Sequence, residues 1–175
     1  IIVASGPNSA LPHARPSDRE LRKGNVVIVD LGATYKGYVS DMTRVFLVGG
    51  GQVDPELAKI YGLTKEAQEE AIRAVRAGAR AHDVDTAARA LIARAGYEGY
   101  FVHSLGHGVG VVVHELPRIA PNVEEELKAS YVITIEPGIY LPGRGGVRIE
   151  DTVLVLEDGA EVLTGPPAPG ELGSC

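Results

Sequence analysis

Residues 26–32 read Val-Val-Ile-Val-Asp-Leu-Gly, a β-branched run of strand length that is interrupted by an ionisable side chain, Asp30. Such a run predicts a buried β-strand. Residues 38–48 predict a second strand, and the Tyr35-Lys36-Gly37 stretch before it predicts a hairpin turn. Asp30 therefore needs a partner, because an unpaired buried charge costs several kcal/mol.

This hairpin brings a second carboxylate to the face of the sheet that carries Asp30. With a two- or four-residue loop, Asp30 shares its face with odd-numbered residues of the second strand, and Asp41 is one of them. A two-residue loop at Tyr35-Lys36 would set the two carboxylates directly opposite, with Cβ atoms about 5 Å apart. Like charges so placed repel unless a proton or a cation lies between them. A bulge would break this parity, and a lone Asp in a strand is more often an edge or bulge residue.

A second pair of carboxylates repeats the pattern nearer the C-terminus. Glu136 follows the run Val-Ile-Thr-Ile at 132–135, and Glu150 interrupts the apolar residues 147–156. The two would face each other if the glycine-containing connection between them is centred near Gly143. The alternative is that Glu150, beside Asp151, is a solvated strand end.

One histidine lies in a glycine-rich stretch. His107 lies in Gly-His-Gly-Val-Gly at 106–110, where glycines let another group approach closely. Together with four carboxylates, one imidazole would form a mostly oxygen site of formal charge −4, which two divalent cations neutralise; Mn²⁺, Co²⁺, Fe²⁺ or Zn²⁺ would each be acceptable. The glycines alone could instead form a tight turn or a phosphate loop, but no Gly-Lys-Ser/Thr follows them.

The order of elements predicts an α+β domain with a mainly antiparallel sheet. Helical periodicity runs from Asp54-Pro55 to Gly78, and a second helix is expected from Asp83 to Gly96. Prolines 117 and 121 predict a loop, after which strands return at 131–136 and 147–156. We expect one domain over residues 1–165 and a flexible tail over 166–175.

Composition excludes several classes of protein. The chain has 175 residues, a net charge of −6 and one cysteine, Cys175, so a disulfide framework and a cysteine-based zinc site are excluded. A pI near 5.4 without a basic run argues against nucleic-acid binding, and no apolar stretch is long enough for a membrane span. We expect a cytoplasmic protein. The start at Ile1-Ile2-Val3-Ala4, without an initiator Met, predicts a fragment of a longer protein.

The ordered motifs resemble those of the pita-bread metallopeptidases, in the prolidase and aminopeptidase P branch. The resemblance covers nearly the whole chain to about residue 165. Its motifs are Ser5-Gly-Pro-Asn-Ser-Ala-Leu-Pro-His13, Asp30-Leu-Gly32, Asp41-Met-Thr-Arg44, His103-Ser-Leu-Gly-His-Gly-Val-Gly110, Val113-His-Glu115, Ile135-Glu-Pro-Gly-Ile-Tyr140 and Val147-Arg-Ile-Glu-Asp151. It implies the pita-bread (creatinase/aminopeptidase) fold, a curved antiparallel sheet flanked by helices. We do not expect these 175 residues to include the helices that precede the first strand in the family, or its separate N-terminal domain.

The resemblance also assigns roles to residues. It implies a dinuclear metal centre, with manganese favoured, whose five ligands are Asp30, Asp41, His107, Glu136 and Glu150. Asp41 and Glu150 would bridge the two ions. The positions that contact substrate and transition state would be His13, His103 and His114. Arg148 would buttress the site and line the substrate pocket, and Arg118 would hold the terminal carboxylate of the substrate.

The implied reaction is hydrolysis of Xaa-Pro peptide bonds, with dipeptides favoured as substrates. A hydroxide activated by two metal ions would attack the carbonyl before proline. Glu136 would act as general base and return the proton to the leaving nitrogen, and His114 would help to stabilise the oxyanion. A methionine or other aminopeptidase of the same fold is the nearest alternative, and a catalytically weak peptide- or protein-binding module is the other. The expected partner is a small peptide, and a homodimer is left open.

Overall fold

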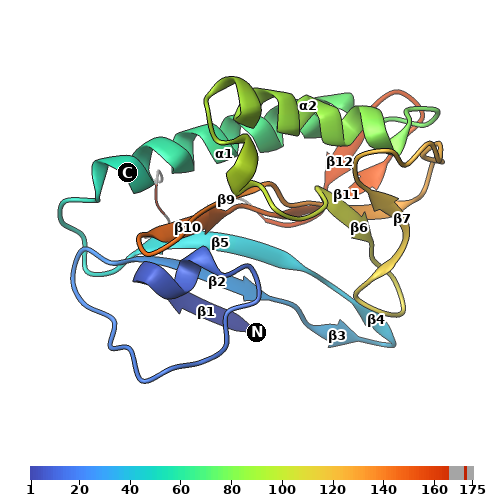
Figure 1. The fold of residues 1–175 in the computed structure, drawn as a ribbon. Helices are drawn as coiled ribbons and strands as arrows, with labels where there is room; N and C mark the ends of the chain where they lie inside the picture. Colours follow the sequence, from blue (N-terminus) through green and yellow to red (C-terminus); the bar gives the residue numbers. More distant parts are fainter. Residues whose placement is uncertain (166–171, 173–175) are drawn as a thin grey trace.

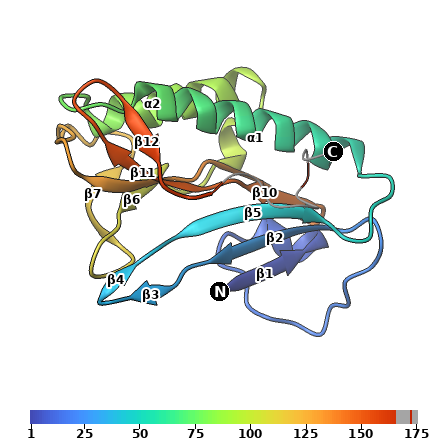
Figure 2. The ribbon, with the colours of Figure 1, turned by 180° about the vertical axis from the view of Figure 1, so that it is seen from behind.

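The computed structural model describes residues 1–165 and Leu172. Its two α-helices lie together over one face of the strands, and β1 lies on the side far from the helices (Figures 1 and 2). The helices are α1 (Pro55–Ala74) and α2 (Ala81–Arg94), with the 3₁₀ turns η1 (Gly6–Ala10) and η2 (Glu98–Tyr100). The strands are β1 (Ile2–Ser5), β2 (Val26–Leu31), β3 (Thr34–Tyr35), β4 (Tyr38–Val39), β5 (Met42–Leu47), β6 (Gly106–Gly108), β7 (Glu115–Ile119), β8 (Val132–Ile135), β9 (Gly138–Leu141), β10 (Gly145–Arg148), β11 (Asp151–Val155) and β12 (Ala160–Val162).

All strand pairings among the described residues are antiparallel, as the sequence predicts. One sheet has the order β1-β2-β5 and a larger one the order β12-β11-β8-β6-β7, with β9-β10 and β3-β4 as two-stranded ladders. A single antiparallel bridge between Thr43 and Glu150 joins the two sheets. The carboxylate-bearing strands of both halves of the chain therefore meet at one seam.

The first hairpin turns within the predicted Tyr35-Lys36-Gly37 stretch, but one residue later than a loop at Tyr35-Lys36. Its two-residue turn is Lys36-Gly37, where both residues have positive φ (49° and 87°), the geometry of the turns that fit a twisted hairpin and that favour glycine. Asp30 consequently pairs with Thr43, so the expectation of Asp30 directly opposite Asp41 is wrong. The parity is as expected, because Asp41 lies two residues before Thr43 and thus on the same face as Asp30.

The second hairpin has the register that the sequence predicts. Ile135 pairs with Asp151 on one side, and Gly138 pairs with Arg148 on the other. Both ladders share one register centred at Gly143, which sets Glu136 opposite Glu150. The solvated-strand-end alternative for Glu150 is wrong, since this residue is 2% exposed.

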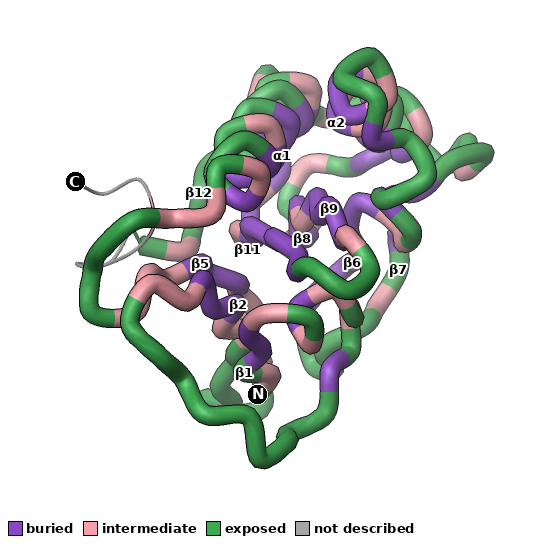
Figure 3. The backbone as a smooth tube through the Cα atoms, turned by 60° about the vertical axis from the view of Figure 1, so that its left-hand side comes forward, coloured by how far each residue is buried: buried purple, intermediate pink, exposed green. Residues whose placement is uncertain are grey.

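The helices cover the strands with one apolar face each. The buried residues of α1 recur at three- and four-residue spacing, from Leu57 through Ile60, Tyr61 and Thr64 to Ala71. Figure 3 shows this buried side facing the strands. Asp54 caps the helix by accepting the Glu56 N–H at 2.8 Å, and Pro55 occupies its first turn. Among the described residues, neither helix is long and apolar enough to cross a membrane.

Several boundaries differ from those expected. Residues 115–119 form strand β7 in place of a loop; Pro117 is tolerated there because β7 is an edge strand. Residues 138–141, expected as part of a glycine-containing connection, form β9. Helix α1 ends at Ala74, short of Gly78, and α2 begins at Ala81. The predicted tail lies outside the described residues, apart from Leu172, whose N–H donates to the Val45 carbonyl at 2.7 Å.

Candidate metal centre

One cleft of about 680 Å³ gathers every side chain to which the sequence assigned a role. These residues come from loops and strand ends spread over the chain. They are His13, Asp30, Asp41, His103, His107, His114, Arg118, Glu136, Arg148 and Glu150. Residues more than 130 positions apart in sequence thus share one wall, because the Thr43–Glu150 bridge joins the two hairpins at this point.

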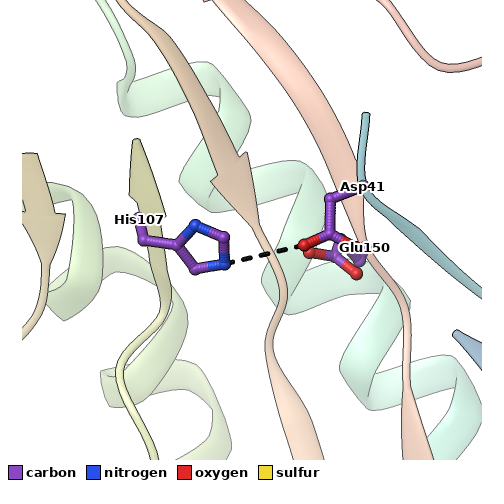
Figure 4. A group of neighbouring side chains, drawn as sticks. All are labelled: Asp41, His107 and Glu150. Carbon is purple, nitrogen blue, oxygen red and sulfur yellow. Dashed lines mark ion pairs between the residues drawn. The ribbon is translucent and has the colours of Figure 1, made fainter. Parts of the chain in front are cut away.

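Asp41, His107 and Glu150 form a cluster in this cleft that could hold a metal ion (Figure 4). Each offers one oxygen or nitrogen atom, and these three atoms all lie within 4.8 Å of one another. His107 Nε2 lies 3.8 Å from Asp41 Oδ2 and 3.3 Å from Glu136 Oε1. Carboxylate oxygens and one imidazole nitrogen at such separations can all reach a cation placed between them.

Glycines allow strand β6 to hold His107 at this point. A Cβ on Gly106 would lie 1.9 Å from the Thr134 carbonyl oxygen, and one on Gly108 would lie 2.3 Å from the Leu116 carbonyl oxygen. Both positions therefore have to be glycine, since β6 is squeezed between β8 and β7. The ring donates its Nδ1–H to the Gly108 carbonyl at 3.0 Å. This hydrogen bond fixes the tautomer and leaves Nε2 facing the carboxylates, as in histidines that ligate metals.

The electrostatics of the cluster favour bound positive charge. Burial, followed by the Asp30 carboxylate, raises the pKa of Asp41 to about 6. Burial and the Glu136 and Asp41 carboxylates raise the pKa of Glu150 well above its usual value. Burial opposes protonation of His107, but the hydrogen bond to Glu136 and nearby carboxylates raise its pKa overall. The folded chain therefore favours bound protons on these three side chains, and a bound cation would relieve the same repulsion between the carboxylates. The residues present fit divalent metal ions.

A hydrogen-bonded chain runs from Asp30 into the protein. Arg148 donates to Asp30 Oδ2 at 2.6 Å and to the Tyr140 hydroxyl at 2.9 Å. Tyr140, whose pKa burial raises to about 12, lies 2.8 Å from His103 Nε2. His103 Nδ1 lies 2.7 Å from the Ser104 carbonyl oxygen and must donate to it, so Nε2 accepts the tyrosine proton. Burial lowers the pKa of His103, which keeps the ring neutral.

Arg148 and His103 are both held by contacts within the protein. Arg148 is 3% exposed and is tied to protein groups, which is the geometry of a buttress. Both ring nitrogens of His103 have protein partners. Direct contact of either residue with substrate stays a prediction.

Three predicted residues lie at the exposed rim of the cleft. The ring of His114 packs edge-on against His107, with ring centroids 4.4 Å apart. Arg118 lies on β7 opposite His107 and is exposed. His13 follows η1, beside Pro12, whose carbonyl accepts a hydrogen bond from Arg148 at 3.2 Å. These side chains are free to meet a ligand that enters the cleft.

Sequence reasoning gave no role to Thr43 or Tyr140. Thr43 donates to Glu150 Oε2 at 2.7 Å from a fully buried position. Both could have been found from strand periodicity, since Thr43 is two residues from Asp41 and Tyr140 is four residues from Glu136.

The comparisons with known proteins agree with this geometry. The profile of metallopeptidase family M24 matches residues 1–157. The chain belongs to this family. A relative from Pyrococcus furiosus named Xaa-Pro dipeptidase is 51% identical over 163 residues, which is 93% of this chain and 46% of that protein. The expected family and pita-bread fold are therefore confirmed.

Solved structures of peptidases superpose closely on this chain. Prolidase from Pyrococcus furiosus has a TM-score of 0.91 at 50% identity, covering 95% of this chain and 49% of that one. X-Pro aminopeptidase from Thermotoga maritima has a TM-score of 0.91 at 44% identity, covering 95% and 47%. The chain spans about half the length of the relatives it matches.

Proposed function

We propose that Asp30, Asp41, His107, Glu136 and Glu150 would hold two divalent metal ions. The cluster of Asp41, His107 and Glu150, with ligand atoms within 4.8 Å of one another, carries this proposal. The raised pKa values of Asp41 and Glu150 support it, because burial and the neighbouring carboxylates both disfavour the charged forms, which a bound cation would stabilise. Manganese is the favoured metal.

We further propose that the M24 chain hydrolyses Xaa-Pro bonds. When bound, the ions would make hydroxide available near neutral pH and polarise the peptide carbonyl. Glu136 has a side chain that is 17% exposed in the cleft, so it can accept a proton there and deliver it to the leaving nitrogen. Proline leaves as a secondary amine, which needs that proton. His114, in contact with His107 at the rim, would donate to the developing oxyanion.

Arg118 and His13 would position the substrate. Arg118 projects from the exposed edge strand β7 and lines the same cleft as the ligands. Its guanidinium would pair with the terminal carboxylate of a dipeptide. This pairing would direct the C-terminal end of the substrate toward β7 and would favour dipeptides over longer peptides. We expect a cytoplasmic protein that acts on small peptides, as a homodimer or a monomer.

The assay uses the manganese-loaded chain with Ala-Pro, Ala-Ala and Ala-Pro-Gly. We expect cleavage of Ala-Pro, slower cleavage of Ala-Pro-Gly and little of Ala-Ala. Arg118→Ala should raise KM for Ala-Pro more than for Ala-Pro-Gly, whereas the exposed-helix control Arg94→Ala should change neither. A chain that holds two ions and cleaves none of the three peptides would overturn the proposed reaction.

An aminopeptidase of the same fold is the second candidate. The close superposition on X-Pro aminopeptidase from Thermotoga maritima favours it. Faster cleavage of Ala-Pro-Gly than of Ala-Pro would select this alternative and leave the metal centre unchanged. A binding module without catalysis is less well supported, since the complete set of candidate ligands lines the cleft.

A further inference from the structure

An ion pair on helix α2 contacts the segment of the chain that carries His103. Asp85 and Arg89 lie one helical turn apart, and the guanidinium binds the carboxylate through two hydrogen bonds, Nε to Oδ2 at 2.7 Å and Nη2 to Oδ1 at 2.8 Å. The Asp85 side chain is 1% exposed and that of Arg89 is 24% exposed. This pair takes no part in the proposed reaction.

The remaining donors of Arg89 hold the segment that leads into the site. Nη1 donates to the Phe101 carbonyl at 3.1 Å, and Nη2 donates to the His103 carbonyl at 2.9 Å. The guanidinium also lies over the Phe101 ring, 4.0 Å from its centroid. This segment, between η2 and β6, has no regular secondary structure. Arg89 therefore supplies hydrogen bonds that a helix or sheet would otherwise provide.

The same contacts continue to the ring of His103. Phe101 packs edge-on against that ring, with centroids 5.2 Å apart and planes at 86°. The ring in turn binds the Ser104 carbonyl and the Tyr140 hydroxyl. The imidazole is thus fixed from one side by Tyr140 and from the other by a segment fastened to α2.

The hydrogen bonds of the Asp85–Arg89 pair are more specific in direction than packing of the helix alone would require. Burying a carboxylate such as Asp85 is costly, and apolar residues of similar size can replace buried ion pairs without loss of stability. A planar guanidinium, however, can satisfy one carboxylate and two carbonyls at fixed angles, which neither lysine nor an apolar side chain can do. The arrangement is therefore suited to setting geometry.

We propose that the Asp85–Arg89 pair positions His103, so that Arg89 is a positioning residue of the site. The catalytic consequence rests on the proposed peptidase function, whereas the positioning itself does not. Loss of the guanidinium would free the Phe101 and His103 carbonyls, let the ring leave its hydrogen bonds to Ser104 and Tyr140, and leave the metal ligands in place.

The direct test is the ring N–H signal of His103 in the metal-free chain labelled with ¹⁵N-histidine. A proton donated to the Ser104 carbonyl exchanges slowly and gives a resolved signal, which His103→Gln assigns. We expect Arg89→Met to lose or shift this signal, and Arg73→Met to keep it. Arg73→Met is the matched control, because it removes an arginine bound to a carboxylate one turn away on the outer face of α1.

Asp85→Asn keeps the test decisive if Arg89→Met does not fold. It retains size and hydrogen bonding but loses the charge that orients the guanidinium, so the signal should weaken or shift in the same direction. A folded Arg89→Met or Asp85→Asn chain with the wild-type His103 signal would overturn the proposal.

The activity readout separates the two proposals. With manganese bound, Arg89→Met should lower kcat/KM for Ala-Pro on the order of 10- to 100-fold and leave the metal stoichiometry unchanged. Wild-type activity in that variant would overturn the catalytic consequence. A wild-type chain without any activity would instead remove the proposed reaction, and the histidine signal would still decide whether Arg89 positions the ring.

Discussion

The Thr43 hydroxyl donates a hydrogen bond of 2.7 Å to Glu150 Oε2, and these two residues also form the backbone bridge between the two sheets. The sheet junction and the orientation of a proposed metal ligand thus depend on the same residue. Arg148 Nε donates to the same hydroxyl oxygen at 3.3 Å, so the hydroxyl accepts from Arg148 while its own proton is donated to Glu150. Thr43 therefore connects the fold to the chemistry of the site.

Removing this hydroxyl should weaken metal binding. Thr43→Val keeps the shape of the side chain but leaves the buried Glu150 oxygen without its donor, so we expect manganese affinity to fall on the order of 10-fold or more. Calorimetry measures the change, and Thr43→Ser is the matched control that restores the hydroxyl and most of the affinity. Equal affinities in wild type and Thr43→Val would show that this hydrogen bond does not matter for binding.

Asp41→Ala should abolish hydrolysis and lower the metal stoichiometry below two while the sheet stays folded. The pKa of this carboxyl is raised to about 6 by burial and Asp30, so the charged form is unfavourable in the metal-free fold. We therefore expect the metal-free variant to melt at or above the wild-type temperature at pH 7.5. An active Asp41→Ala chain with two bound ions would contradict the ligand assignment.

The metal-free chain should become more stable as pH falls from 8 to 6. Asp41, Glu150 and His107 have pKa values raised in the folded state, so the fold binds these protons more tightly than the unfolded chain does. The stabilisation from protons bound to these three groups is present at low pH and is lost as pH rises through the pKa values of the folded state. His103, with a lowered pKa, opposes the trend toward the acid end.

Thermal unfolding at several pH values measures this trend. Asp41→Asn should flatten the slope between pH 8 and 6, which distinguishes the effect of the site from that of net charge. Manganese should bind more weakly at pH 6 than at pH 8, because protons compete for the same atoms. If Asp41→Asn and every other variant of the site keep the wild-type dependence of melting temperature on pH, the electrostatic account is refuted.

The cap of α1 should contribute measurable stability far from the site. Asp54 accepts the Glu56 N–H and a two-bond pair from Arg144 at 2.9 and 2.7 Å, which ties the β9–β10 turn to the helix. Asp54→Ala should cost about 1–2 kcal/mol in urea unfolding. Glu70→Ala, which removes only an exposed pair with Arg73, should cost much less than Asp54→Ala and serves as its control. Equal losses in the two variants would contradict the role of the cap.

Strand parity made much of the site predictable from the sequence. The shared face of Asp30 and Asp41, and the opposition of Glu136 and Glu150, follow from the two-residue period of a strand and from where the turns can lie. The first turn was misplaced by one residue because Lys36 takes a positive φ that its residue type does not signal. Periodicity alone also gives no indication of β7, where proline is tolerated only because the strand lies at an edge.

The supporting contacts were not predictable in the same way. Arg89 meets the Phe101 and His103 carbonyls only because α2 packs behind the segment that leads into β6. Thr43 meets Glu150 across 107 residues of sequence. Such pairs depend on how the helices and the two sheets come together, which local patterns do not encode.

A calorimetric titration of the metal-free chain with Mn²⁺ tests the central claim most directly. Four carboxylates and His107 in one cleft predict two ions per chain. Binding should also release protons near pH 6, because the raised pKa values of Asp41, Glu150 and His107 favour bound protons in the metal-free chain. Binding of no ion, or a stoichiometry that is the same in wild type and Asp41→Ala, would contradict the proposed dinuclear centre.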